Sequence, residues 1–128
     1  MAKGVYQIDD HKAVNVYLVV GRDSALVIDT GMGAADLVSV IKKLTSKPLI
    51  VVNTHGHPDH TGANYQFEKV YIHPADMEAA MSCSTSESRN AAAQSMLKGE
   101  KPSAEETFKG TPENTMLVPV REGYVFNL

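Results

Sequence analysis

Short apolar runs separated by polar turns mark the beginning of the chain. Residues 5–8, 14–20 and 25–28 are apolar or alternate between apolar and polar positions, a pattern typical of β-strands. The Gly-Arg-Asp-Ser sequence at 21–24 predicts a tight turn between the second and third of them. Residues 49–52 form a continuous apolar run, as expected for a strand buried on both faces. The pattern predicts an opening β-meander followed by a central strand.

Between the third and fourth strands the apolar positions follow a helical period. Within Gly33 to Ser46, the residues that share one helical face are Leu37, Val40, Ile41 and Leu44. Lys42 and Lys43 lie outside this face, and Pro48 follows the end of the helix. Strands and helices therefore alternate, which predicts an α/β (α+β) fold with helices packed on a mixed sheet.

The rest of the chain continues the alternation. The segments expected there are a short helix over 61–67, a strand over 69–72, a helix that begins at Pro74, a helix over 91–97, and strands over 116–120 and 123–128. The last segment alternates Tyr124, Phe126 and Leu128 on one face. An apolar strand at the edge of a sheet exposes unpaired backbone groups, so we expect it to contact a further segment or a second chain.

Three of the five histidines lie in the loop after the fourth strand. His55 and His57 alternate, so in an extended segment both side chains would face the same way and bind one ion. Asp59 and His60 would face a second ion close by. Imidazole and carboxylate ligands suit zinc, up to two ions, or iron or manganese instead. Because a merely structural turn rarely needs four such donors, the loop predicts a metal site.

Asp29 ends the third strand, directly before Thr30 and Gly31. A carboxylate at this place can accept hydrogen bonds from imidazole ligands or loop amides and so orient the ligands. The same three residues also suit a turn that leads into a helix. The nearby histidine loop favours the first interpretation.

These two segments resemble the motifs of a known family. Thr54 to Gly62 reads Thr-His-Gly-His-Pro-Asp-His-Thr-Gly and is similar to the HxHxDH signature of the metallo-β-lactamase-fold superfamily, and Leu26 to Gly31 resembles the first motif of that superfamily. The resemblance implies the N-terminal half of a four-layer αββα sandwich. It implies His55 and His57 as ligands of one metal, Asp59 and His60 as ligands of another, and Asp29 as their supporting residue.

The superfamily completes its site with later residues that have no match here: a histidine in a Gly-His-Thr-type motif, a bridging aspartate and a last histidine. No histidine follows His73, and no aspartate follows Asp76. The resemblance therefore implies a single partial domain over 1–128, which needs a C-terminal-half chain or a homo-oligomer to complete the site.

The resemblance also implies a metal-dependent hydrolase of the glyoxalase II-like sort. A metal-activated water, oriented by Asp59 as the catalytic residue, would attack a thioester, lactam, lactone or phosphoester of a small-molecule substrate. Two alternatives remain open. The chain could instead be a non-catalytic or regulatory half-domain that assembles through its C-terminal strand, or a di-iron redox protein.

Composition narrows the function classes further. The chain has 128 residues, 43% of them hydrophobic and 21% charged, and a net charge of −3, as in a small soluble domain. It has no basic stripe for nucleic acid and no apolar run of membrane-spanning or signal-peptide type, so we expect a cytoplasmic protein. Cys83 is the single cysteine, which excludes an internal disulfide. His73 lies in a strand-to-helix turn whose backbone needs explain it, and His11 lies in a polar turn, where we expect it to be solvated.

Overall fold

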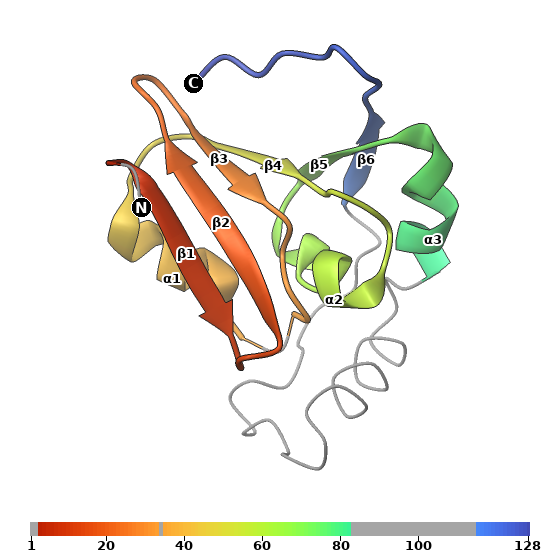
Figure 1. The fold of residues 1–128 in the computed structure, drawn as a ribbon, viewed down its shortest axis with the longest axis horizontal. Coiled ribbons are helices and arrows are strands. Elements are labelled where there is room, and N and C mark those ends of the chain that lie inside the picture. The colour runs from red at the N-terminus through yellow and green to blue at the C-terminus, as the bar shows by residue number, and fades with distance from the viewer. Residues whose placement is uncertain (1–2, 34, 83–114) are drawn as a thin grey trace.

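A computed structural model describes residues 3–33, 35–82 and 115–128. Within these residues, six strands form one sheet in the order β1-β2-β3-β4-β5-β6 (Figure 1). The strands are β1 (Val5–Asp10), β2 (Val14–Val20), β3 (Ala25–Ile28), β4 (Leu49–Val52), β5 (Lys69–Ile72) and β6 (Met116–Pro119). The first three are antiparallel, and β3 to β6 are parallel. The expected meander and mixed sheet are confirmed.

Short helices connect the parallel strands. They are α1 (Leu37–Leu44), α2 (Pro58–Thr61), the 3-10 helices η1 (Asn64–Gln66) and η2 (Pro74–Asp76), and α3 (Met77–Ser82). Among the described residues, no helix is long and apolar enough to cross a membrane.

The core lies between one face of the sheet and α1. The strand register places Leu18 beside Val27 and Val27 beside Val51, so these side chains share a face. All three are buried, and they belong to one cluster with Leu37 and Ile41 of α1. The predicted apolar face of α1 is confirmed for Leu37 and Ile41, whereas Val40 and Leu44 on the same face are exposed. Figure 1 shows α1 behind the strands.

Helix α1 begins four residues later than the predicted start at Gly33. The Asp36 side chain caps the helix, because its Oδ1 accepts the Ser39 N–H at 3.1 Å and its Oδ2 accepts the Ser39 hydroxyl at 2.6 Å. Gly33 has a φ of +77°, which is incompatible with a helix, and its Cα lies tightly against the backbone of Gly62. Packing against the site loop therefore shortens the helix.

The helix predicted over 61–67 is confirmed only in part. Its first residue is the last residue of α2, which begins at Pro58 inside the histidine loop, and η1 forms separately after it. Proline suits the first turn of a helix, where its missing N–H costs nothing. The helix predicted to begin at Pro74 is present as η2 followed directly by α3. The helix predicted over 91–97 lies outside the described residues.

The predicted strand over 123–128 is wrong. A turn closed by the Tyr124 N–H and the Arg121 carbonyl (3.1 Å) redirects the chain after β6. The segment then runs back across the molecule towards the β2–β3 turn (Figure 1), where the Ser24 hydroxyl donates to the Asn127 carbonyl at 3.2 Å. The ring centroid of Phe126 lies 5.3 Å from that of Tyr71. Aromatic packing on the sheet thus replaces the expected strand pairing.

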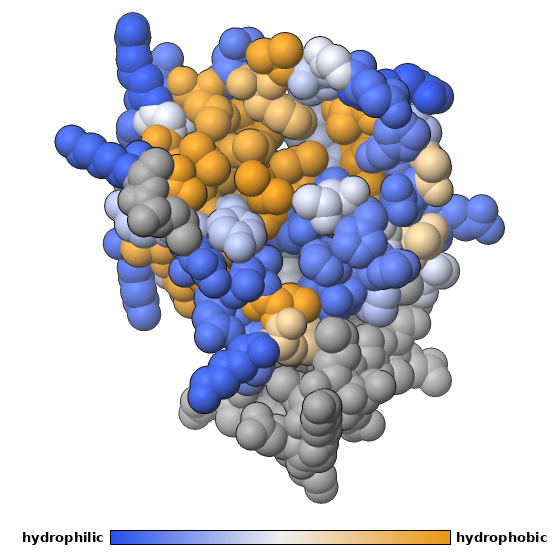
Figure 2. All heavy atoms as spheres, viewed as in Figure 1, coloured by the Kyte–Doolittle hydropathy of each residue, from blue (hydrophilic) through white to orange (hydrophobic). Residues whose placement is uncertain are grey.

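The face of the sheet opposite α1 stays largely open; we call it the outer sheet face. By register and alternation it carries Tyr17, Val19, Leu26, Ile28, Ile50, Val52, Tyr71 and Val118. None of these side chains is buried. Figure 2 shows a hydrophobic area over the strands. Apolar patches of this kind mark contact surfaces.

Strands β4 and β5 are joined by a single register pair, Val52 with Tyr71. Below this pair the strands border a cavity of about 340 Å³, whose lining includes Leu49, Phe67 and Lys69. We call this weakly paired boundary the β4–β5 seam. Above it, the Asn53 N–H donates to the Tyr71 carbonyl at 2.8 Å. The sheet is therefore least continuous at the amino-terminal ends of β4 and β5, and the two strands are paired at the end that carries the histidine loop.

The Asp36 cap gives a test of the α1 boundary. We expect Asp36→Ala to lower the free energy of unfolding by about 1 kcal/mol, measured by urea denaturation at pH 7. Asp36→Asn is the control, since its side-chain oxygen still accepts the Ser39 N–H. Hydrogen bonds from the Ser39 hydroxyl and then its amide lower the pKa of Asp36. The stabilisation should therefore be present above the unfolded-state pKa and be lost as the pH falls through the folded-state pKa. Equal stability of the Ala and Asn variants would contradict this assignment.

Candidate metal centre

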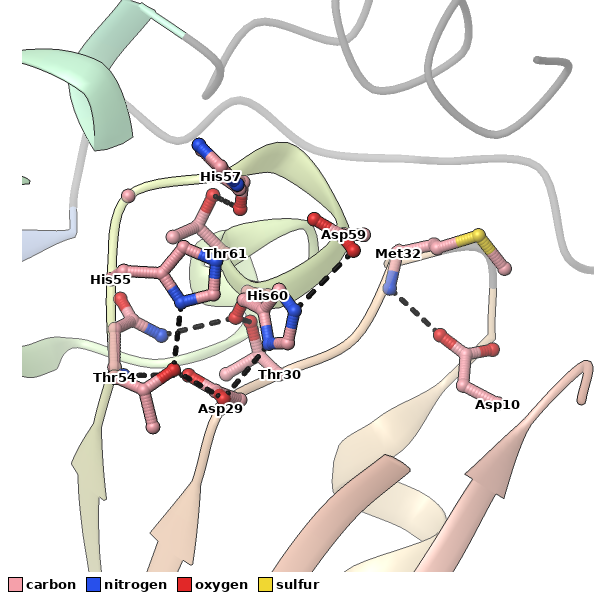
Figure 3. Close-up of polar contacts among 12 residues, drawn as sticks. Asp10, Asp29, Thr30, Met32, Thr54, His55, His57, Asp59, His60 and Thr61 are labelled. Carbon is pink, nitrogen blue, oxygen red and sulfur yellow. Dashed lines mark hydrogen bonds and ion pairs between the residues drawn. The ribbon is translucent and has the colours of Figure 1, made fainter. Parts of the chain in front are cut away.

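The histidine loop lies at the carboxyl ends of the parallel strands β3 and β4, where open α/β sheets place their ligand sites. His55, His57 and Asp59 each offer one ligand atom, and these atoms all lie within 4.8 Å of one another. His55 and Asp59 are partly buried, whereas His57 is exposed. The three side chains therefore converge on one point at the rim of the molecule (Figure 3).

His60 adjoins this group. Its ring centroid lies 4.2 Å from that of His55, and its Nε2 lies 3.3 Å from Asp59 Oδ2. Asp59 thus approaches His60 and also lies within 4.8 Å of the ligand atoms of His55 and His57. All four predicted ligands come together, and Asp59 is placed to serve either of two ions. The division into two ligand pairs stays a prediction.

Asp29 lies beneath the ligands and is almost fully buried. Its carboxylate accepts the Thr54 N–H at 2.7 Å and the Thr54 hydroxyl at 2.8 Å, and its Oδ2 lies 2.9 Å from His60 Nδ1. Its φ of +63° is unusual for a residue other than glycine, and such strain persists only where the surroundings enforce it. Its contacts are those expected of a residue that orients the ligands.

Thr54 connects Asp29 to His55 and orients the His55 ring, a role that the sequence did not indicate. The Thr54 hydroxyl donates to Asp29, so its oxygen must accept from His55 Nδ1, which lies 2.9 Å away. An ionised carboxylate only accepts, so His60 Nδ1 must likewise carry a proton. His55 is thereby held in the tautomer whose Nε2 lone pair is available to a metal, whereas Nε2 of His60 faces the Asp59 carboxylate at 3.3 Å. Figure 3 shows the chain of contacts from Asp29 through Thr54 to His55.

A buried pair of asparagines supports the loop from below. Asn64 Nδ2 donates to Asn53 Oδ1 at 2.7 Å, and Asn53 Nδ2 donates to Asn64 Oδ1 at 3.1 Å. Asn53 Nδ2 also lies 3.1 Å from the His60 carbonyl oxygen, and the Thr30 hydroxyl donates to Asn64 Oδ1 at 2.9 Å. A satisfied buried network of this kind makes the backbone rigid. Sequence inspection missed it, since two asparagines eleven positions apart carry no recognisable pattern.

The other two histidines lie outside the group. His73 Nδ1 accepts the Ala75 N–H at 3.1 Å, and its Nε2 lies 3.5 Å from Glu122 Oε1. His11 Nδ1 lies 2.7 Å from Asp10 Oδ1 in the β1–β2 turn. A local capping contact accounts for His73, as expected, whereas His11 is partly buried beside Asp10 and not fully solvated. Cys83 lies outside the described residues.

A sequence profile described as the metallo-beta-lactamase superfamily matches residues 9–113. The chain belongs to this superfamily. The match includes both the segment around Asp29 and the histidine loop, and the six-stranded α/β sheet agrees with the superfamily's fold.

Known proteins similar to this superfamily member include a curated relative and solved structures. The human acyl-coenzyme A thioesterase MBLAC2 is 36% identical over 77 residues, which are 51% of this chain and 28% of that protein. The BLEG-1 B3 metallo-beta-lactamase is 27% identical with a TM-score of 0.51, over 58% of this chain and 39% of that one. TTHA1623, solved in a di-iron-bound form, has a TM-score of 0.62 at 24% identity, over 95% of this chain and 57% of that one. The chain spans less than a third of the length of its human relative.

The metallo-β-lactamase fold implies binding of a divalent metal, and the donor set fits one. Two imidazoles and a carboxylate are ligands that zinc and similar ions accept. The contact with Thr54 fixes the tautomer of His55 that presents Nε2, and the contact with Asp29 fixes the ring of His60. Orientation of this kind by neighbouring groups is typical of metal-binding histidines.

The Thr54 hydroxyl can be tested directly. We expect Thr54→Val to weaken zinc binding about 10- to 100-fold, because His55 loses the acceptor that fixes its ring. The measurement is a competition titration against a chromophoric chelator. Thr54→Ser keeps the hydroxyl and should bind zinc like the wild type. Thr54→Val should also lower the melting temperature, because the buried Asp29 carboxylate loses one of its hydrogen bonds, whereas Thr54→Ser should not. Equal zinc affinity of the Val and Ser variants would refute the role of the hydroxyl.

Proposed function

We propose that this chain is part of a metal-dependent hydrolase that cleaves a thioester of a small acyl group or acyl chain. The observation that carries the proposal is the convergence of His55, His57 and Asp59, with ligand atoms within 4.8 Å of one another at the carboxyl ends of the strands. Superfamily membership supports a hydrolytic reaction. The cofactor proposed is zinc, up to two ions, and iron or manganese would fit the same donors.

Each residue of the group has a distinct task in this proposal. His55 and His57 hold the first ion, and His60 together with Asp59 holds a second. A divalent ion in this place supplies Lewis acidity and makes water a nucleophile near neutral pH. The Asp59 carboxylate, which His60 Nε2 approaches to 3.3 Å, would orient the attacking water. Asp29 keeps His60 in place during the reaction.

The substrate class rests on the curated relatives. The proteins that match with 36% identity carry the name acyl-coenzyme A thioesterase, but the alignment covers 28% of their length. The carbonyl carbon of a thioester is open to attack by metal-activated water, since sulfur donates less to the carbonyl than oxygen or nitrogen does. Lactams, lactones and phosphoesters are the alternatives within the same superfamily chemistry.

We further propose that ligands from another polypeptide segment complete the site, either from a complementing C-terminal-half chain or from a second copy. Three donors in one group are the minimum for a catalytic zinc ion, and a second ion would share them. The outer sheet face is apolar and accessible beside this site, which favours assembly with such a segment. The same surface supports the second candidate function, a non-catalytic half-domain that acts through assembly.

The test is hydrolysis of acyl-coenzyme A thioesters, followed by the released thiol, with zinc-loaded and metal-free protein. We expect metal-dependent turnover that is abolished in His57→Ala, because the group loses a ligand. The matched control is His73→Asn, which replaces a histidine outside the group and keeps a side-chain oxygen for the Ala75 N–H. It should retain wild-type turnover.

The same assay, run with lactam, lactone and phosphodiester substrates, separates the alternatives. If the protein hydrolysed one of these substrates and not thioesters, the proposed substrate class would change, but the proposed metal-dependent mechanism would stand. Metal binding without turnover of any substrate would favour the non-catalytic half-domain. Two tightly bound iron ions that take up electrons, again without hydrolysis, would favour the redox alternative. Unchanged turnover in His57→Ala would refute the ligand assignment.

A further inference from the structure

Two carboxylates outside the ligand group each hold a backbone amide of a site-forming loop. We propose that Asp76 and Asp10 are positioning residues. Asp76 fixes the segment from His55 to His57. Asp10 fixes the loop after Asp29, on which the helix with Asp59 and His60 rests. The inference rests on the proposed metal site. It adds that the two halves of the site are anchored separately, by different parts of the fold.

Asp76 acts at the centre of the first segment. Its Oδ1 accepts the N–H of Gly56 at 3.1 Å, and Gly56 is the residue between His55 and His57. The relative direction of these two side chains depends on the backbone torsions at Gly56, which glycine leaves unusually free. A hydrogen bond at this amide therefore restrains the most flexible point between the two ligands.

Close packing reinforces the contact. Gly56 is buried against the start of α3: a Cβ atom on it would lie 2.6 Å from the Asp76 carbonyl oxygen and 2.8 Å from the Ala79 Cβ. No bulkier residue fits there without displacing α3. Because the amide is shielded from solvent, loss of the Asp76 carboxylate would leave it without an equivalent partner. The segment could then adopt other backbone conformations, in which the side chains of His55 and His57 diverge.

Asp10 acts on the other segment from the end of β1. Its Oδ2 accepts the N–H of Met32 at 2.7 Å, and Met32 is almost completely buried. The same oxygen lies directly over Gly31, where a side chain would collide with it. Asp10 therefore holds the loop that follows Asp29 (Figure 3).

That loop is bonded directly to α2. The Thr30 N–H donates to the His60 carbonyl at 2.9 Å, and the Gly62 N–H donates to the Gly31 carbonyl at 2.8 Å. The backbones touch, since a Cβ atom on Gly62 would collide with Met32. A shift of Met32 must therefore move the helix that bears Asp59 and His60. Asp10 acts through this contact and touches no ligand itself.

The turn that presents Asp10 is itself strained. His11 and Lys12 have φ values of +55° and +59°, a conformation that glycine and asparagine normally supply in such hairpins. The turn is closed by the Ala13 N–H and the Asp10 carbonyl at 3.1 Å. Backbone strain persists where surrounding contacts enforce it, and it gathers at functional sites. Here the contacts of Asp10 with Met32 and His11 enforce it.

The experiment compares Asp76→Ala and Asp10→Ala with Asp76→Asn and Asp10→Asn in the full chain. The asparagines keep an oxygen that can accept the same amide. Amide hydrogen exchange of the metal-free variants is measured first. We expect Asp76→Ala to accelerate exchange at 54–57, and Asp10→Ala to accelerate it at 30–33 and 59–62, with the remaining sheet unchanged. Both asparagine variants should exchange like the wild type.

Cobalt titration, followed by visible absorbance, is the second measurement. We expect both alanine variants to bind about 10- to 100-fold more weakly than the wild type, with the asparagines restoring most of the affinity. Uniformly faster exchange across the sheet, or unchanged exchange in both loops, would overturn the inference. Absence of cobalt binding by the wild type would refute the proposed metal site instead. The exchange pattern would still decide whether the two carboxylates position the loops.

Discussion

The buried carboxylate of Asp29 is the contact on which the site depends. It accepts three hydrogen bonds, from the amide and hydroxyl of Thr54 and from the ring of His60. A carboxylate this deeply buried is stable only when its oxygens are satisfied, so the loops around it have little freedom to rearrange. The requirements of one buried charge thus determine the orientation of two potential ligands. The strained backbone at Asp29 is compatible with this, because its own contacts hold it there.

Much of the framework follows from the sequence, because it depends on local patterns. The strands β2 to β5 and the face of α1 that packs on them were predicted from periodicity and turn residues. The ligand group was predicted from the spacing of His55, His57, Asp59 and His60. In each case the information lies within a few consecutive residues.

The remaining features depend on contacts between distant segments. Thr54, the Asn53–Asn64 pair and the carboxylate of Asp76 each work through a partner that only the folded chain brings near. The segment over 123–128 alternates like a strand, but its aromatic rings pack on Tyr71 and its backbone runs back towards the β2–β3 turn. Local periodicity could not distinguish strand pairing from this aromatic packing, because the packing depends on contacts with distant residues.

The β4–β5 seam has a consequence for how binding energy spreads through the molecule. All four proposed ligands and Asp29 lie on one side of it, in the unit that ends with η1, whereas β5, α3 and β6 lie on the other. A ligand stabilises only those states of the protein in which its site is intact. Metal binding should therefore suppress local unfolding of the unit that contains the site, and have less effect on local unfolding of the unit across a weak boundary. The hydrogen bonds from Gly56 to Asp76 and from Asn53 to Tyr71 are the polar links that span the boundary at the level of the loop. The Thr115 hydroxyl adds a further link, since it donates to the Asn64 carbonyl at 3.1 Å, and Val51 and Val70 belong to the same buried cluster across the boundary. Together these contacts couple occupancy of the site to the second unit.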